Sequence, residues 1–298
     1  MSIKKKMKMF TCFGEVLWDV FDHQKKIGGA PLNVALRLKS FNDNVSIISS
    51  IGNDDLGHEI LDYLSKNELK TDHIQINNQF ETGQVLVTLD KNGSASYDIK
   101  FPSVWDYIEL TSNSIELVKQ SEVFVFGSLV CRNTESKNTL LKLIDYAKFK
   151  VFDVNLRPPH YSFDVLKVLM SKADFIKFND EELDLISKTL ESGFNTLEDN
   201  IKYISSRFNT SQICVTRGNK GAVLFINNKF YYNEGYPVIV KDTVGAGDSF
   251  LATLLYKLSS IKNPQLAIDY ACAVGAIVAS SEGANPFVSE EKINQLIG

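Results

Sequence analysis

Short apolar runs alternate with helix-like stretches along this chain of 298 residues. The runs Phe10–Leu17 and Val45–Ile51 alternate with helical patterns at 33–41 and 56–64. Further strand candidates share the same apolar character: Val123–Phe126, Lys150–Val154, Ala173–Lys177 and Gln212–Thr216. Because crossover helices join parallel strands, the alternation predicts an α/β fold with a mostly parallel central sheet.

Two candidate hairpins interrupt this alternation. Gln84–Leu89 and Ser94–Ile99 flank Lys91-Asn92-Gly93, and Asn-Gly is a favoured hairpin turn because both residues tolerate positive φ. We expect this hairpin, within residues 82–106, to form a small β-sheet lid with residues 16–26. Ala222–Ile226 and Phe230–Asn233 predict an antiparallel edge on the main sheet. No linker or repeat divides the chain, so we expect a single domain over residues 1–298.

The composition disfavours several classes of function. With 44% apolar and 23% charged residues the chain is an ordinary globular one, and its net charge of −4 does not attract a polyanion. We therefore expect no nucleic-acid partner. The basic run Lys4–Lys6 leads into a segment too short for a membrane span, so no membrane partner is expected either. Four cysteines without C-x-x-C spacing favour buried reduced thiols in a cytoplasmic protein, and four histidines without helical ligand spacing do not indicate a metal site.

The most informative stretch is Asp242-Thr243-Val244-Gly245-Ala246-Gly247-Asp248-Ser249-Phe250, which leads into the helix-forming run Leu251–Leu258. Small residues let backbone amides surround an anion, and the helix start adds a positive dipole end. Asp248 lies beside these amides and is suited to accept a hydroxyl proton during phosphoryl transfer. The alternative is an ordinary helix start in which Asp248 is the N-cap. P-loop and dinucleotide-binding motifs are absent from the sequence.

A second stretch, Gly28-Gly29-Ala30-Pro31-Leu32-Asn33-Val34-Ala35, also places glycines before a predicted helix. Glycines allow a ligand to approach the backbone closely, and the Asn33 amide can donate to and accept from hydroxyl groups. This chemistry suits a sugar. The alternative is a plain helix start with Asn33 in solvent.

Together these two stretches resemble the signatures of the ribokinase-like, phosphofructokinase B-type carbohydrate kinases, and Gly52-Asn53-Asp54-Asp55-Leu56-Gly57 extends the first signature. The resemblance covers essentially the whole chain. It implies a three-layer α/β/α fold with a small β lid, and an ATP-dependent kinase that transfers a γ-phosphate to a sugar hydroxyl.

The resemblance also implies roles for individual residues. Asp248 would be the catalytic base, and the amides of Gly245, Ala246 and Gly247 would form an anion hole for the migrating phosphoryl group. The residues expected around the sugar are Asp19, Gly28, Gly29 and Asn33. A solvated aspartate at a strand end is the alternative for Asp19.

Further residues of the resemblance would serve the nucleotide and the cations. Asn179 and Glu182 match an N-x-x-E motif that arranges Mg²⁺ and phosphates through water, although a capped acidic helix start fits the same string. Asp242 matches a ligand of a monovalent cation, usually K⁺. The residues expected to contact the nucleotide, with a bare turn as the alternative for the first three, are Thr216, Gly218, Gly221, Gly247 and Cys272. Cys272 stands where many relatives carry Asn beside the adenine.

The substrate is suggested by fructokinase-like strings. Arg157 belongs to Asp153-Val154-Asn155-Leu156-Arg157 and could hold a phosphate or sugar oxygen; Gly127 belongs to Phe126-Gly127-Ser128. Lys100 replaces the Arg of an Arg-x-Pro string. Fructose is therefore the expected substrate, with another ketose, ribose, 2-keto-3-deoxygluconate or a nucleoside as alternatives. A phosphorylated sugar would need basic groups in the lid, for which Lys100 and Arg132 are the candidates.

Two other classes of function stay open. One is a sensor that binds sugar and nucleotide without turnover, which the intact Asp248 and glycines disfavour. The other is a structural protein, which would have no use for two glycine loops beside acidic residues. We also expect that the apolar side of the lid can pair with a second copy in a homodimer, with a monomer as the alternative.

Overall fold

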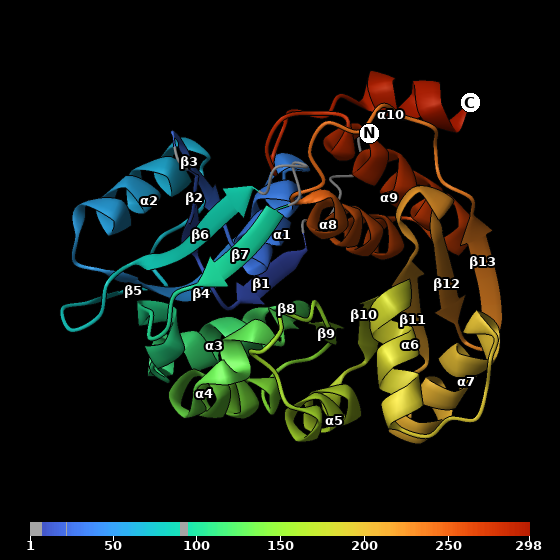
Figure 1. Cartoon of the computed structure of the whole chain (residues 1–298), viewed down its shortest axis with the longest axis horizontal. Helices are drawn as coiled ribbons and strands as arrows, with labels where there is room; N and C mark the ends of the chain where they lie inside the picture. The colour runs from blue at the N-terminus through green and yellow to red at the C-terminus, as the bar shows by residue number, and fades with distance from the viewer. Residues whose placement is uncertain (1–7, 22, 90–94) are drawn as a thin grey trace, which may run out of the picture. The chain divides into compact units, whose positions relative to one another are not determined.

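The computed structural model describes residues 8–21, 23–89 and 95–298 (Figure 1). The basic run Lys4–Lys6 and the turn Lys91-Asn92-Gly93 lie outside the described residues. By the density of its contacts, the chain divides into two compact units. Unit 1 comprises residues 1–124 and 130–148, and unit 2 comprises residues 125–129 and 149–298. The single domain over residues 1–298 stays a prediction.

The main sheet has nine strands in the order β13-β12-β11-β10-β9-β8-β1-β4-β5. The strands are β1 (Met9–Phe13), β4 (Asn44–Gly52), β5 (Ile74–Asn77), β8 (Val123–Gly127), β9 (Lys150–Asp153), β10 (Phe175–Asn179), β11 (Gln212–Thr216), β12 (Ala222–Ile226) and β13 (Lys229–Asn233). Strand β1 pairs in parallel with β4, and β10 with β9 and β11. Strands β11, β12 and β13 pair antiparallel. The predicted parallel sheet with an antiparallel edge is confirmed.

One predicted strand was placed incorrectly. The apolar run suggested Ala173–Lys177, but β10 spans Phe175–Asn179. Ala173 is the C-cap of the preceding helix, and its N–H donates to Met170 O. Asp174 then bonds the start of β9, because its carboxylate accepts from Lys150 N and its N–H donates to Lys150 O. The strand begins only after these two residues have ended the helix.

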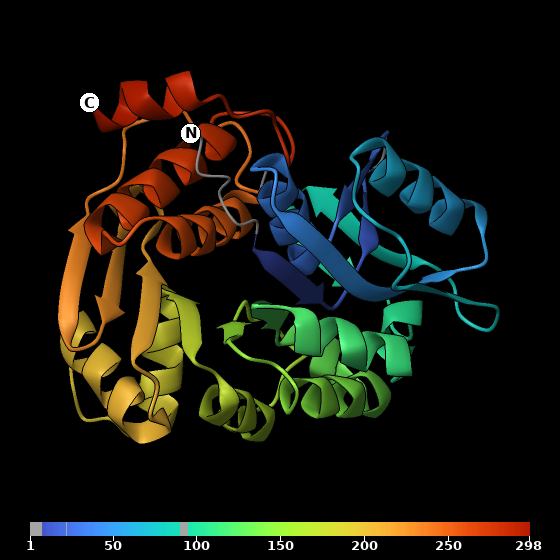
Figure 2. The same cartoon turned by 180° about the vertical axis from the view of Figure 1, so that it is seen from behind.

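The described residues form ten α-helices, of which α8, α9 and α10 follow the last strand. They are α1 (Ala30–Ser40), α2 (Asp55–Lys66), α3 (Ser112–Gln120), α4 (Thr134–Ile144), α5 (Phe163–Lys172), α6 (Asp180–Thr189), α7 (Leu197–Phe208), α8 (Ala246–Ser260), α9 (Pro264–Ala279) and α10 (Glu290–Ile297). In unit 2, α6 and α7 pack against β10 and β11, and α9 packs against β12 and β13. Figures 1 and 2 show α6 and α7 on one side of these strands and α9 on the other, as the predicted helix-covered sheet requires. No helix among the described residues is long and apolar enough to cross a bilayer.

A second, four-stranded sheet in unit 1, here called the lid sheet, has the order β3-β2-β6-β7. Its strands are β2 (Leu17–Val20), β3 (Lys25–Gly28), β6 (Gly83–Leu89) and β7 (Ala95–Ile99). The predicted lid sheet is therefore confirmed, but β3 continues to Gly28, past the predicted boundary at residue 26, and leads directly into α1. The homodimer through this sheet stays a prediction.

Asp54 follows β4 of the main sheet and joins the end of this strand to Thr82, which precedes β6 of the lid sheet. Its Oδ1 accepts from Gly57 N at 2.8 Å and from Thr82 Oγ1 at 2.6 Å, and its Oδ2 accepts from Thr82 N at 2.8 Å. Thr82 Oγ1 in turn accepts from Gly52 N at 3.0 Å. Burial disfavours the charged Asp54, but the hydrogen bonds from Thr82 and Gly57 outweigh it and lower the pKa of Asp54.

Asp54→Ala is expected to destabilise the protein by about 1–3 kcal/mol, because it removes the N-cap of α2 and leaves the N–H of Thr82 without its acceptor. Thermal unfolding measures the effect. Since the pKa of Asp54 is lower in the folded state, its stabilisation is complete above the unfolded-state pKa and is lost as pH falls through the folded pKa. The Tm difference from wild type should therefore shrink in acid. The exposed Asp55, changed to Ala, is the control, and an equal Tm loss in both variants would contradict the role of Asp54.

The four cysteines are all free and buried: Cys12, Cys131, Cys214 and Cys272. Burial raises the pKa of Cys131 and of Cys272 to about 12. This confirms the expectation of buried reduced thiols.

Candidate functional site

Two helices differ from the others at their N-termini. Eight of the ten helices have an N-cap side chain that accepts a hydrogen bond from the first turn: Asp54, Thr111, Asn133, Ser162, Asn179, Thr196, Asn263 and Ser289. Helices α1 and α8 instead begin at Gly29 (φ 108°) and Gly245 (φ 75°), with no side-chain cap. No side chain therefore satisfies their first turns, although the N–H of Ala246 donates to Thr243 O at 3.3 Å. These are the two glycine stretches that the sequence singled out.

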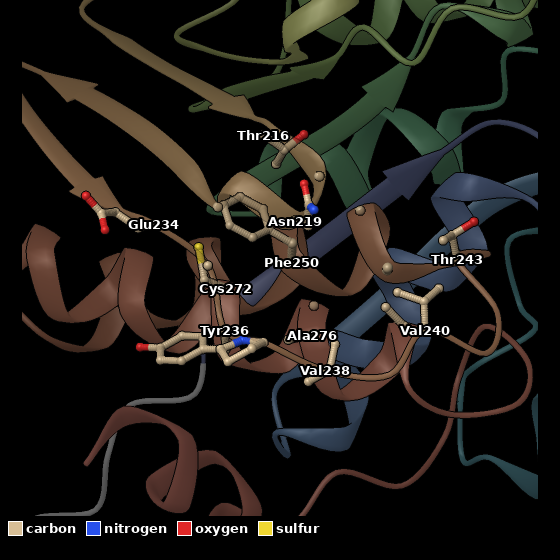
Figure 3. A pocket seen from close by; sticks show the side chains of 18 residues that line it. Thr216, Asn219, Glu234, Tyr236, Val238, Val240, Thr243, Phe250, Cys272 and Ala276 are labelled. Carbon is tan, nitrogen blue, oxygen red and sulfur yellow. The ribbon is translucent and has the colours of Figure 1, made fainter.

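A cavity of about 630 Å³ opens in unit 2 beside the start of α8 (Figure 3). Its volume is typical of a site for a small organic ligand. The residues predicted to serve the nucleotide or the phosphoryl group that line it are Thr216, Gly218, Gly221, Ala246, Gly247 and Cys272. Thr243 and Val240 lie at one end, and Glu234 and Tyr236 at the other. The cavity therefore has the start of α8, which no side chain caps, at one end and the ring of Tyr236 at the other.

Asp248 lies in the first turn of α8, whose N-cap is Gly245. The alternative in which Asp248 itself caps the helix is wrong, because the helix has already begun at Ala246. The carboxylate is therefore held within the turn whose amides line the cavity. This geometry leaves Asp248 suited to a role in proton transfer.

The predicted sugar-binding residues gather in unit 1 where β3 meets α1. Asp19 is on β2 opposite Lys26, Gly28 ends β3, and Gly29 precedes α1. Asn33 is 3% exposed, and its N–H donates to Gly29 O at 2.9 Å, so the alternative of a solvated Asn33 is wrong. Lys100 is exposed and follows β7, with its Nζ 3.4 Å from Gln84 Oε1.

Asn179 and Glu182 form a capping box at the start of α6. Asn179 Oδ1 accepts from Glu182 N at 2.7 Å, and Glu182 Oε2 accepts from Asn179 N at 2.8 Å. Glu182 Oε1 accepts from Leu156 N at 2.8 Å, so both oxygens are engaged. Burial raises the pKa of Glu182, although the nearby Lys177 acts in the opposite direction. The predicted helix-cap alternative is thus observed, and contact with Mg²⁺ through water stays a prediction.

Cation sites built from the protein alone are not evident in the part of the chain that the structure describes. No group of three His, Cys, Asp or Glu side chains there is placed to hold a metal ion. Mg²⁺ commonly binds through one or two carboxylates together with substrate phosphates and water, so its predicted site does not require such a group. Asp242, the predicted K⁺ ligand, accepts from Val244 N at 3.0 Å and Gly283 N at 3.2 Å, and thereby ties the approach to α8 to the loop after α9.

Comparison with known proteins assigns the chain to a family. The model of the pfkB family carbohydrate kinases matches residues 3–291. The chain belongs to the pfkB family of carbohydrate kinases.

Individual relatives agree with this assignment. Fructokinase-2 of Solanum habrochaites is 27% identical over 279 residues, 88% of this chain and 84% of that protein. An uncharacterised sugar kinase of Pyrococcus horikoshii is 31% identical over 282 residues, 90% of this chain and 85% of that protein. Its structure in complex with ATP has a TM-score of 0.81 and covers 97% of this chain and 99% of that one.

A structure of a double mutant of Vibrio cholerae fructokinase with fructose, ADP and potassium ion bound is 23% identical. It has a TM-score of 0.84 and covers 98% of this chain and 99% of that one. At this identity the likeness shows the fold, which is the ribokinase-like α/β fold expected from the sequence.

In this pfkB family member, Arg157 and Gly127 lie in unit 2, outside the lining of the cavity. Arg157 is exposed on the loop after β9, and its Nη1 donates to Leu156 O at 3.0 Å. Gly127 ends β8 beside β9. Their roles stay predictions.

Arg132 is not available to bind a substrate phosphate as the sequence suggested. Its guanidinium makes two 2.7 Å bonds to the Asp106 carboxylate, donates to Lys100 O at 2.7 Å and stacks over Trp105 at 3.8 Å. The side chains of Arg132 and Asp106 are 3% and 0% exposed. The pair therefore braces the end of β7 within unit 1, and Lys100 alone of the two candidates keeps an exposed cation.

Sequence reasoning missed the apolar lining of the cavity. Tyr236 and Val238 come from an irregular segment after β13, where no periodic pattern signals a position. Gly275, Ala276 and Ala279 line it from α9. The run of small residues in α9 was the available signal, because small side chains on one helix face leave room for a ligand.

Proposed function

We propose that this protein is an ATP-dependent fructokinase that transfers the γ-phosphate to a hydroxyl group of fructose. The observation that carries the proposal is the cavity in unit 2, which reaches the start of α8 at Ala246 and Gly247. Asp248 follows in the same first turn, outside the lining of the cavity. The pfkB family assignment supports carbohydrate as the acceptor. The named relatives support fructose and ATP: two are fructokinases, and one binds ATP.

In the proposed reaction, Asp248 accepts the proton of the attacking sugar hydroxyl. The N–H groups at residues 245–247 stabilise the charge that develops on the transferred phosphoryl group, and they need no reorganisation because the helix already orients them. Adenosine would occupy the end of the cavity lined by Tyr236 and Cys272. Mg²⁺ held by the phosphates would neutralise their charge, with Glu182 reached through water and Asp242 bound to K⁺.

An unphosphorylated sugar fits the lid sheet better than a sugar phosphate. The guanidinium of Arg132 is buried against Asp106 and backbone carbonyls, which leaves Lys100 as the exposed cation of the two candidates. A dianionic phosphate is normally bound by several donors. The buried free thiols support a reducing, cytoplasmic location for the enzyme, which is part of the proposal.

The test is an ADP-release assay with Mg²⁺ and K⁺ across a sugar panel. The panel contains fructose, other ketoses, ribose, 2-keto-3-deoxygluconate, fructose phosphates and adenosine. Fructose should give the highest kcat/KM, and the fructose phosphates should give little turnover. A higher kcat/KM for another acceptor would identify that acceptor as the substrate in place of fructose, and the assignment as a kinase would still hold. Binding of ATP and sugar by calorimetry without ADP release would instead favour the sensor.

A further inference from the structure

Lys177 places a buried cation beside the start of α8. Its Nζ bonds Asp153 Oδ1 at 2.8 Å, and the side chains of Lys177 and Asp153 are 8% and 6% exposed. A methyl group on Gly247 would lie 3.7 Å from this Nζ. The ammonium group is thus adjacent to the backbone whose amides line the cavity, yet neither the sequence motifs nor the proposed reaction use it.

The surroundings of Lys177 are dominated by carboxylates. Burial disfavours its charged form, but Asp153, Glu182 and Asp248 outweigh this and raise the pKa of Lys177, so that it stays protonated. Taken as whole residues, Asp153 and Glu182 are 4% and 6% exposed. Asp153 Oδ2 is buried and has no hydrogen-bond partner in the described part of the chain. Lys177 is therefore the cation that faces three carboxylates in a poorly solvated region.

These carboxylates are a difficulty for phosphoryl transfer. A nucleotide phosphate at the start of α8 brings more negative charge to a region that already holds Asp248, Asp153 and Glu182. In a poorly solvated interior like charges interact strongly, and a fixed cation offsets them without any rearrangement. A neutral residue at position 177 would leave the repulsion uncompensated when charge moves to the transferred group.

We propose that Lys177 is a positioning residue for phosphoryl transfer, whose buried charge, fixed by Asp153, offsets the carboxylates near the start of α8. This inference rests on the proposed kinase function. Lys177 would act through the backbone and the local electric field, so its replacement should affect kcat more than the KM for sugar or ATP. The simpler alternative is an ion pair that only joins β9 to β10.

A double substitution separates the two roles. Lys177→Met alone leaves Asp153 buried without a counter-charge and should lower both Tm and kcat. Lys177→Met combined with Asp153→Asn removes both charges, and replacing both partners of a buried ion pair is often close to neutral for stability. We expect the double variant to regain most of the Tm but to keep a kcat about 10- to 100-fold below wild type, with each KM changed less than about threefold.

The control is Lys150→Met, which removes the ion pair between Lys150 and Asp174 at 3.0 Å. This pair joins the other ends of β9 and β10, so its loss should leave kcat unchanged. If kcat of the double variant returns to the wild-type value together with Tm, Lys177 is only structural and the proposal is overturned. If wild-type protein neither binds ADP by calorimetry nor releases it with any sugar, the proposed function and this inference both fail.

Discussion

Asp248→Asn is expected to lower kcat by about 10²- to 10⁴-fold while leaving sugar affinity nearly unchanged. The amide has the shape of the carboxylate but cannot accept the hydroxyl proton. The amides of α8 remain in place, because the N-cap of this helix is Gly245 and not Asp248. Steady-state kinetics give kcat, calorimetry gives the affinity for sugar, and thermal unfolding checks that the variant is folded.

The matched control is Asp164→Asn in α5. Asp164 is also an acid in the first turn of a helix of unit 2, but its side chain is 95% exposed and lies outside the cavity. Its substitution should leave kcat at the wild-type value. Near-normal turnover in Asp248→Asn would show that another group takes the proton, whereas a large loss of Tm would show that Asp248 has a mainly structural role.

Gly245→Ala and Gly247→Ala are both expected to lower activity, but for different reasons. At Gly245, φ is 75° and an added methyl group would lie 2.6 Å from both Cβ and O of Ala284. Alanine is strained in this conformation and the neighbouring backbone cannot yield easily. Gly245→Ala should therefore lower stability by about 1–3 kcal/mol as well as activity.

Gly247 has room for a methyl group within the protein. Lys177 Nζ at 3.7 Å is its nearest described neighbour apart from the residues beside it and its own helix backbone. Since alanine favours a helix over glycine by about 0.5–1 kcal/mol, Gly247→Ala should keep or slightly raise the Tm. The methyl group would occupy space beside the amides that the phosphate must reach, so kcat/KM for ATP should fall at least about tenfold. Full activity with an unchanged Tm would show that the nucleotide phosphate does not bind at the start of α8.

Local signals predicted much of this structure because they act over a few residues. The pair Asn227-Asn228 between apolar runs specified the antiparallel edge, and both residues have positive φ. Asn179 and Glu182 are separated by one helical turn, so their capping box could be predicted from the string alone. The glycines before α1 and α8 likewise marked both uncapped helix starts.

Contacts between distant segments could not be predicted in the same way. Lys177 meets Asp153 because β9 and β10 are neighbours in a particular register, in which Lys177 lies opposite Asp153. Arg132 meets Asp106 because two short 3-10 helices, Val104–Tyr107 and Leu129–Arg132, lie close together. This contact buried a candidate for phosphate binding. The apolar lining contributed by Tyr236 and Val238 depends on the path of an irregular segment. Each of these contacts is fixed by tertiary packing and not by local sequence preference.

The burial of all four thiols has a practical consequence for studying the two units. All four side chains are buried, although Cys272 also lines the cavity. Burial raises the pKa of Cys131 and Cys272, so thiol-directed dyes should react slowly with the native protein. A single cysteine introduced on an exposed helix would then be labelled selectively, without first removing the native ones. Pairs of such labels, one in each unit, would allow the distance between the units to be followed by fluorescence energy transfer as sugar and nucleotide are added.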